Sequence, residues 1–274
     1  MEQITIHTAQ FPQLGYRKVG SGPSIVLLHG FPANGELWQQ VWTDLAASFT
    51  VIVPDIPGSG ASTFSGEKVS MEQLADSVKL ILDHEGIRET ILFGHSMGGY
   101  IALAFADKYG TMLRGLSLVH STALEDSEEK KELRLKSIEL LRKGGKDPFV
   151  RQMIPGLFAA SFCLAHPDVI AEQVNRGLQL DVKSMIAFYF AMRERSNKVN
   201  VLRMSKFPIQ WIMGKKDNII PYMKALEQSH LNEINFVSFY IESGHMSMLE
   251  NPTQLKNDIA VFSEYCYKRI FSTN

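Results

Sequence analysis

The segment ILFGHSMGGYIAL, residues 91–103, constrains the fold of this chain more strongly than any other stretch of its sequence. It places one serine, Ser96, among the glycines Gly94, Gly98 and Gly99, between two apolar runs. Glycine allows tight turns and close backbone approach, so this composition predicts a sharp connection from a buried strand to a buried helix. A non-glycine residue at the centre of such a turn carries backbone strain of about 1–3 kcal/mol, which proteins keep mainly at functional sites.

Short apolar runs and amphipathic segments alternate on both sides of this turn. The apolar runs predict strands at 23–30, 48–55, 89–95 and 113–120, and helical spacing predicts helices at 36–48, 71–86 and 97–110. Strands that are apolar at nearly every position are typical of a parallel sheet covered by helices on both faces. The alternation therefore predicts an α/β fold with a doubly wound, mostly parallel sheet.

The alternation is interrupted after His120 and resumes near residue 205. The intervening residues show helical patterns at 127–145, 167–179 and 181–196, without a strand between them. Strands are then expected at 207–214 and 234–245, and helices at 222–230 and 252–271. We expect a core domain formed by residues 1–120 and 205–274, interrupted by a helical cap formed by residues 121–204.

Composition excludes several classes of protein. The chain has 274 residues, with 28 basic and 29 acidic side chains and no basic block, which argues against nucleic acid as a partner. Cys163 and Cys266 form no paired motif, and two free thiols are typical of a reducing compartment. The start of the chain lacks a signal-peptide pattern, and the longest apolar stretches, about 13 residues, are too short to span a membrane. We expect a cytoplasmic protein with no membrane partner.

Three residues that suit nucleophilic catalysis follow predicted strands, in the order Ser96, Asp217 and His245. Functional residues of open α/β sheets gather at the carboxyl ends of the strands, so these three are expected to meet. Residues 94–98 fit the pattern G-x-S-x-G, which raises the serine hydroxyl above a sheet. A serine hydroxyl needs a neighbouring base, and His245 is the candidate, with Asp217 orienting its imidazole.

The remaining site predictions concern the groups around this triad. The backbone N–H groups of Phe31 and Met97 are the expected oxyanion donors, because one lies in the loop after a strand and the other follows the nucleophile. Glu125 and Asp126 are rivals to Asp217, but they begin a charged run and are expected to face water. We found no paired spacing of metal-ligating residues, and we expect no metal.

A substrate pocket is expected under the inserted helices. Its candidate lining residues are His120, Phe158, Phe162, Met185, Phe188 and Tyr189, although most of these could instead pack the helices against one another. Arg193 and Arg195 could pair with a substrate carboxylate, but solvated cations at a helix end are the alternative.

The segments LLHGFP, PDIPGSGAS, GHSMGG, GKKD and SGHMSMLENP together resemble the α/β-hydrolase family, particularly its small capped serine esterases and lactonases. The resemblance implies an eight-stranded, mostly parallel sheet, a lid over the site, and no metal or organic cofactor. Family members that cleave haloalkanes or epoxides carry aspartate as the nucleophile, so Ser96 excludes that chemistry. HGFP stands where some lipases carry HGGG, which argues against bulky, tertiary-alcohol or long-chain lipid esters.

The leading hypothesis is a serine hydrolase that cleaves small to medium carboxylic esters or lactones through an acyl-enzyme on Ser96. Three alternatives keep the same triad: a carbon–carbon bond hydrolase, a cofactor-free perhydrolase, and a ligand-binding, receptor-like module with weak turnover. Neither the natural substrate nor the oligomeric state follows from the sequence.

Overall fold

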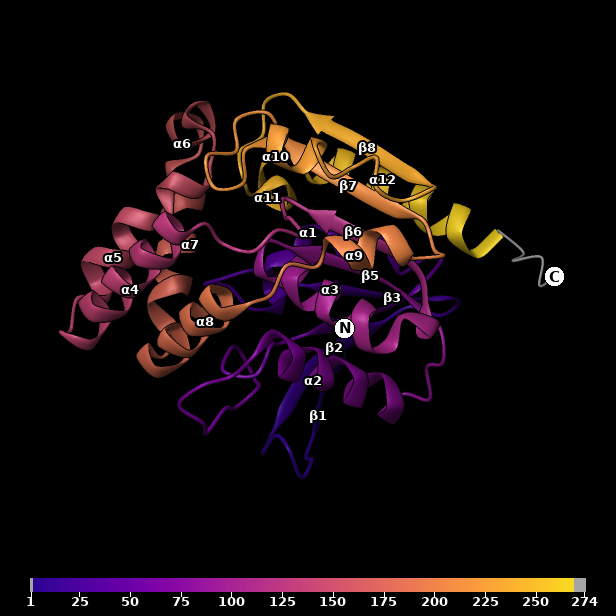
Figure 1. The fold of residues 1–274 in the computed structure, drawn as a ribbon, viewed down its shortest axis with the longest axis horizontal. Coiled ribbons are helices and arrows are strands. Elements are labelled where there is room, and N and C mark those ends of the chain that lie inside the picture. Colours follow the sequence, from indigo (N-terminus) through magenta and orange to yellow (C-terminus); the bar gives the residue numbers. More distant parts are fainter. Residues whose placement is uncertain (1, 269–274) are drawn as a thin grey trace.

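Eight strands form one sheet in the computed structural model, which describes residues 2–268 (Figure 1). The strands are β1 (Glu2–Ile6), β2 (Leu14–Val19), β3 (Ser24–Leu28), β4 (Thr50–Pro54), β5 (Thr90–His95), β6 (Leu113–Val119), β7 (Ile209–Gly214) and β8 (Asn235–Tyr240). They lie in the order β1-β2-β4-β3-β5-β6-β7-β8. β1 and β2 are antiparallel to their neighbours and all other pairs are parallel, which confirms the predicted mostly parallel sheet.

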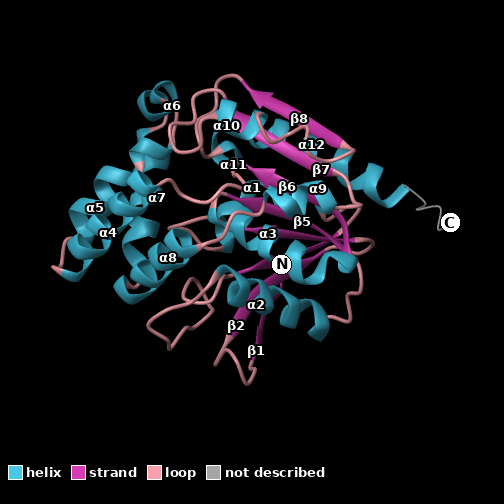
Figure 2. Ribbon diagram, in the orientation of Figure 1, coloured by secondary structure: helices cyan, strands magenta, loops and turns pink. Residues whose placement is uncertain are grey.

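Helices cover both faces of this sheet (Figure 2). Alternate residues of β5 show the two layers, because the ring of Phe93 packs against Phe262 of α12, whereas Gly94 lies against Gly98 in α3. The core helices are α1 (Gln39–Leu45), α2 (Met71–His84), α3 (Met97–Tyr109), α10 (Tyr222–Leu226), α11 (Ser247–Glu250) and α12 (Pro252–Lys268), with 3₁₀ turns η1 (Gly35–Trp38) and η2 (Gly110–Met112). Residues 269–271 of the predicted last helix lie outside the described residues.

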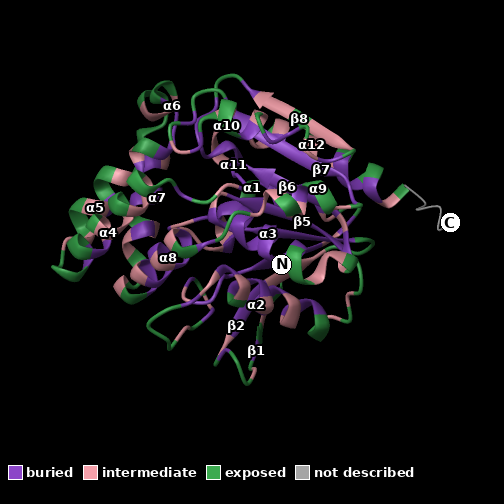
Figure 3. Ribbon diagram, in the orientation of Figure 1, coloured by how far each residue is buried: buried purple, intermediate pink, exposed green. Residues whose placement is uncertain are grey.

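The central strands are buried on both faces, as their uniform apolar character predicts (Figure 3). Every residue of β3 and β5 is buried, which fixes these strands in the middle of the core. The residue patterns did not identify β1 and β2, which form the antiparallel edge. β1 exposes most of its residues, so it lacks the apolar run that marked the others.

Residues 121–204, which we call the inserted segment, contain only helices between β6 and β7. They are α4 (Glu128–Arg142), α5 (Lys146–Met153), η3 (Pro155–Leu157), α6 (Ala160–Ala165), α7 (Pro167–Gln179), α8 (Val182–Glu194) and α9 (Val199–Met204). Figure 1 shows α4 to α8 gathered beside the sheet, at the left, while α9 returns to the core and packs on α3. Asp181 caps α8, since its carboxylate accepts the N–H groups of Lys183 and Ser184.

The described helices do not include one that has both the length and the apolar character needed to cross a bilayer.

Candidate active site

Ser96 connects β5 to α3 in a strained backbone conformation, with φ of 51° and ψ of −115°. A positive φ is uncommon for a residue with a side chain and indicates that the surrounding structure enforces it. Ser96 is partly exposed, although the residues on both sides of it, His95 and Met97, are buried. The turn therefore presents one hydroxyl at the surface of an otherwise buried layer.

The glycines next to Ser96 are required by backbone contacts. A Cβ on Gly94 would lie 2.4 Å from the carbonyl oxygen of Gly98, and a Cβ on Gly98 would lie 2.5 Å from that of Leu28. A Cβ on Gly30 would lie 3.0 Å from the Cβ of Ser96. The loop after β3 and the turn after β5 thus touch through bare backbone, as the three-glycine pattern predicted for the turn.

Asp217 and His245 form a buried hydrogen-bonded pair. His245 Nδ1 lies 2.7 Å from Asp217 Oδ2, while Asp217 Oδ1 accepts the N–H groups of Ile219 and Ile220 at 2.8 and 2.9 Å. Burial alone would raise the pKa of Asp217, but the imidazoles of His245 and His120 hold that pKa well below its usual range. An ionised Asp217 accepts the Nδ1 proton of His245 and so leaves Nε2 as the basic nitrogen.

His95 brings this pair beside the serine turn. His95 Nε2 lies 2.8 Å from the backbone carbonyl oxygen of His245, and the two rings have centroids 4.9 Å apart. A carbonyl oxygen only accepts, so Nε2 of His95 carries the proton. Burial and the neighbouring His245 and His120 hold the pKa of His95 well below its usual value, so this imidazole is neutral. No hydrogen bond within residues 2–268 joins Ser96 Oγ to His245 Nε2. Such bonds are often long in unliganded enzymes and shorten when substrate binds.

The two predicted oxyanion donors, the backbone N–H groups of Phe31 and Met97, belong to the loop and the helix that adjoin Ser96. Phe31 directly follows Gly30, which touches Ser96, and Met97 is the first residue of α3. Within the described part of the chain, neither backbone N–H donates a hydrogen bond. The first N–H groups of a helix have no acceptor in the helix itself, and they favour negative charge.

His120 lies next to Asp217 and does not line the cavity described below. It ends β6 with a φ of 49°, its side chain is fully buried, and its Nδ1 lies 3.3 Å from Asp217 Oδ2. Both imidazoles therefore face the same carboxylate oxygen, with His245 at the shorter distance. The sequence showed that His120 ends a strand, but its contact with Asp217 depends on the pairing of β6 with β7.

His120, Asp217 and His245 are also the one group among the described residues that could hold a metal ion, since their ligand atoms lie within 4.8 Å of one another. The 2.7 Å separation of His245 Nδ1 from Asp217 Oδ2 is a hydrogen-bond distance. A direct hydrogen bond occupies the space that an ion would need between these two atoms. The expectation of no metal stays a prediction.

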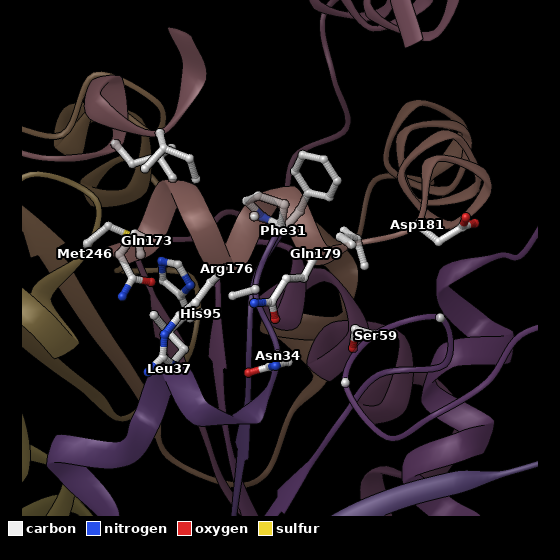
Figure 4. A pocket seen from close by; sticks show the side chains of 18 residues that line it. Phe31, Asn34, Leu37, Ser59, His95, Gln173, Arg176, Gln179, Asp181 and Met246 are labelled. Atoms are coloured by element: carbon white, nitrogen blue, oxygen red, sulfur yellow. The ribbon is translucent and has the colours of Figure 1, made fainter. Parts of the chain in front are cut away.

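A cavity of about 240 Å³ lies between the core and the inserted segment (Figure 4). Phe31, His95 and Met246 belong to its wall, so the cavity adjoins the turn of Ser96 and the loop of His245. Figure 4 shows polar side chains from both parts of the chain around it. They are Asn34, Ser59, Gln173, Arg176, Gln179 and Asp181.

The six residues predicted to line a pocket are not part of this wall. Phe158 stacks on Phe162 at 5.6 Å between ring centroids, Met185 is fully buried, and His120 contacts Asp217. Phe188 and Tyr189 touch the ring of Phe31 edge-on, at 6.4 and 5.0 Å. These two hold the residue that carries a predicted oxyanion donor.

Asp126 does not face water, so that expectation was wrong. Its carboxylate is buried, hydrogen-bonded by Arg134 Nε, and 2.9 Å from Arg195. Burial alone would raise the pKa of Asp126, but the two guanidinium groups lower it. Arg195 is buried in this ion pair and against the ring of Tyr100, and Arg193 lies 3.7 Å from Glu194. Arg195 therefore pairs with a carboxylate of the inserted segment and packs on α3, and it is not a solvated cation.

Comparison with known proteins agrees with this architecture. A family model described as the α/β hydrolase fold matches residues 23–143, which include the serine turn. The solved structure of a thermophilic esterase from Thermogutta terrifontis, with malate bound, superposes with a TM-score of 0.91. It is 30% identical, and the match covers 97% of this chain and 99% of that one. The chain belongs to the α/β-hydrolase family.

Curated relatives of this α/β hydrolase match to different extents. An uncharacterised protein of Mycobacterium tuberculosis is 37% identical over 117 residues, or 41% of this chain and 34% of that protein. The hydrolase thus matches only about a third of that relative's length. A pimeloyl-[acyl-carrier protein] methyl ester esterase of Pseudoalteromonas atlantica is 24% identical, over 89% of this chain and 95% of that protein.

The residue patterns did not identify two further groups at this site, His95 as a hydrogen-bond donor and Glu250. The loop of His245 is held by both. The sequence does not reveal these roles, because both side chains bind backbone atoms, and every residue has the same backbone groups.

Proposed function

We propose that this α/β hydrolase cleaves small carboxylic esters or lactones through an acyl-enzyme on Ser96. The observation that carries the proposal is the buried Asp217–His245 hydrogen bond beside a strained, partly exposed serine. A serine with an oriented imidazole base is the arrangement that nucleophilic acyl transfer needs. The likeness to an esterase at 30% identity over nearly the whole chain supports the same class of reaction.

The proposed reaction has two halves. Ser96 Oγ attacks the carbonyl carbon while His245 Nε2 takes the hydroxyl proton, and the N–H groups of Phe31 and Met97 receive the resulting oxyanion. Collapse of the intermediate breaks the bond to the leaving oxygen, which takes the proton from His245. Water, deprotonated by His245, then attacks the acyl carbonyl carbon. Collapse breaks the bond to Ser96 Oγ, which takes the proton back from His245 as the acid is released. A lactone would yield one ring-opened hydroxy acid.

The cavity supports small, uncharged substrates. Its volume of about 240 Å³ is below the range of about 300–1,000 Å³ that is usual for drug-sized ligands. Arg176 is the one Lys or Arg among its lining residues, and Glu36 and Glu172 already match it at 3.1 and 2.6 Å. We infer that the inserted segment acts as a cap that closes this space over the substrate.

Labelling with a fluorophosphonate tests the proposal. The wild-type enzyme should be labelled and should hydrolyse p-nitrophenyl acetate, and Ser96→Ala should lose both properties. Ser65→Ala is the matched control, because Ser65 is exposed in a loop, and it should behave as the wild type. An unlabelled wild type, or label retained in Ser96→Ala, would contradict the acyl-enzyme. Tight ligand binding with negligible turnover would instead indicate a receptor-like module.

Substrate charge is tested separately. A p-nitrophenyl ester of a short neutral acid should react with a higher kcat/KM than the corresponding ester that carries a terminal carboxylate. Equal or reversed values would contradict the inferred preference for uncharged substrates.

A further inference from the structure

The loop that carries His245 is held by a carboxylate that the proposed mechanism does not use. Glu250 Oε1 accepts the N–H of Gly244 at 3.0 Å, and Glu250 Oε2 accepts the N–H of Met246 at 3.0 Å. The two donors lie on either side of His245 in the chain. One side chain therefore fixes the backbone before and after the proposed base.

The same carboxylate also reaches the inserted segment. Glu250 Oε1 accepts the N–H of Ala159, the residue before α6, at 2.8 Å. A second hydrogen bond runs beside it, because the N–H of His245 donates to the carbonyl oxygen of Leu157 at 2.8 Å. Gly244 packs so closely here that an added Cβ would lie 2.6 Å from the backbone nitrogen of Ala159. The loop of residues 244–246, which we call the base loop, therefore contacts the inserted segment through backbone atoms on both sides.

Glu250 is matched by amide donors and not by a cation. Among the described residues no lysine, arginine or histidine forms an ion pair with it, whereas three backbone N–H groups point to its two oxygens. Hydrogen bonds from N–H groups to an ionised carboxylate are about twice as strong as neutral ones, and they are directional. Three directional hydrogen bonds hold their donor groups in a fixed geometry, which an ion pair with a mobile cation would not do.

We propose that Glu250 is a positioning residue that couples the inserted segment to the imidazole of His245. Its two oxygens set the height and tilt of the base loop against Ser96, and the link to Ala159 makes that setting depend on where the inserted segment lies. A segment that is displaced would pull the N–H of Ala159 away from Oε1 and release one constraint on the loop. The inference rests on the proposed function, because it assigns His245 as the base.

Two variants separate the parts of this link. Glu250→Gln keeps the shape of the side chain, but its amide NH₂ must face at least one backbone N–H, so at least one of the three hydrogen bonds is lost. Ala159→Pro removes the donor from the inserted segment and places the ring Cδ where that N–H lay, facing Glu250 Oε1, so it breaks the same link from the other side. Ala159 has a φ of −62° and Phe158 before it is extended, with φ of −105° and ψ of 159°, so the backbone dihedral angles here already suit proline.

The control is Glu242→Gln, which makes the same chemical change on a neighbouring turn. The Glu242 side chain is 74% exposed and pairs with Lys216 at the surface. We expect wild-type behaviour from it in every assay below.

The measurements are the rate of fluorophosphonate labelling per folded molecule, kcat and KM for p-nitrophenyl acetate, and the low-field proton resonance of the His245–Asp217 hydrogen bond. A misplaced catalytic group costs on the order of a hundredfold, so we expect Glu250→Gln to lower the labelling rate by about that factor and Ala159→Pro by about tenfold. KM should change less than kcat, and the proton resonance should shift or broaden in both variants.

A residue that only stabilises the fold would lower Tm and leave the labelling rate of folded molecules unchanged. Folded Glu250→Gln and Ala159→Pro that label at the wild-type rate and keep the wild-type resonance would overturn the inference. If one variant fails to fold, the other decides. Failure of the proposed function has a different signature, since label would then be absent from the wild type or retained in Ser96→Ala.

Discussion

Replacing Asp217 with asparagine tests the proposed catalytic geometry most directly, because the structure fixes which way the new amide points. Asp217 Oδ1 accepts two backbone N–H groups, from Ile219 and Ile220. The amide oxygen of the introduced asparagine must take the place of Oδ1. Turning the amide around would lose two hydrogen bonds and bury two donors against an NH₂ group, at a cost of at least about 2 kcal/mol.

The amide NH₂ then faces His245 Nδ1 across the 2.7 Å separation that the carboxylate oxygen now spans. Two donors cannot face each other, so the imidazole must present its lone pair at Nδ1 and carry its proton on Nε2. That tautomer cannot accept the proton of Ser96. In serine proteases the equivalent change lowers kcat by about 10⁴ while the geometry stays intact. We expect a loss of similar size here, with a small effect on stability.

The assay is steady-state hydrolysis of p-nitrophenyl acetate near neutral pH, together with a thermal melt of each protein. Asp83→Asn is the control, since Asp83 lies on the outer face of α2 with its side chain 53% exposed. Wild-type activity is expected for the control. Asp217→Asn that keeps more than about a tenth of the wild-type kcat would refute the assignment of Asp217 as the residue that orients the base.

Two further predictions concern stability. Gly94→Ala forces a Cβ to within 2.4 Å of a backbone oxygen, so we expect about 3 kcal/mol of destabilisation and a fall in Tm on the order of 10 °C. The control is Gly156→Ala, whose added Cβ enters open space and should leave Tm at the wild-type value. Equal Tm values for the two variants would contradict the argument. The lowered pKa of Asp217 stabilises the folded state above the unfolded pKa of about 3.9, and this stabilisation is lost as pH falls towards the folded value. Urea unfolding at pH 6 and pH 3 should therefore show a smaller acid-induced loss for Asp217→Asn than for the wild type, and an equal loss would count against an ionised, hydrogen-bonded Asp217.

Sequence patterns predicted the parts of this fold that depend on burial along one segment. β3 and β5 are apolar at nearly every position because both of their faces are covered, and the patterns identified both. β1 lies at the edge of the sheet and exposes most of its residues, so its sequence shows no comparable run. Edge strands depend on their neighbour for hydrogen bonds, and that neighbour is not visible in the strand's own residues.

The candidate site divides in the same way. The residue pattern placed Ser96 in a strand-to-helix turn because the adjacent glycines mark the close contacts locally. The environment of Asp126 was misjudged because its charged neighbours suggested solvent, whereas Arg195, far along the chain, forms the ion pair that allows its burial. A charge run predicts exposure only where no distant partner of opposite sign is brought to it.

Three imidazoles lie close together at this site, and their hydrogen bonds assign them different roles. His95 donates Nε2–H to a backbone carbonyl, which leaves it neutral and structural. His120 faces Asp217 from behind with both ring nitrogens buried. His245 differs from His120 in its shorter contact with the carboxylate, because its Nδ1 lies 2.7 Å from Asp217 Oδ2 whereas the Nδ1 of His120 lies 3.3 Å from it. In the proposed mechanism His245 is the base, and three sets of hydrogen bonds fix its loop. His95 Nε2–H donates to the carbonyl oxygen of His245, the N–H of His245 donates to Leu157, and the N–H groups of Gly244 and Met246 donate to Glu250.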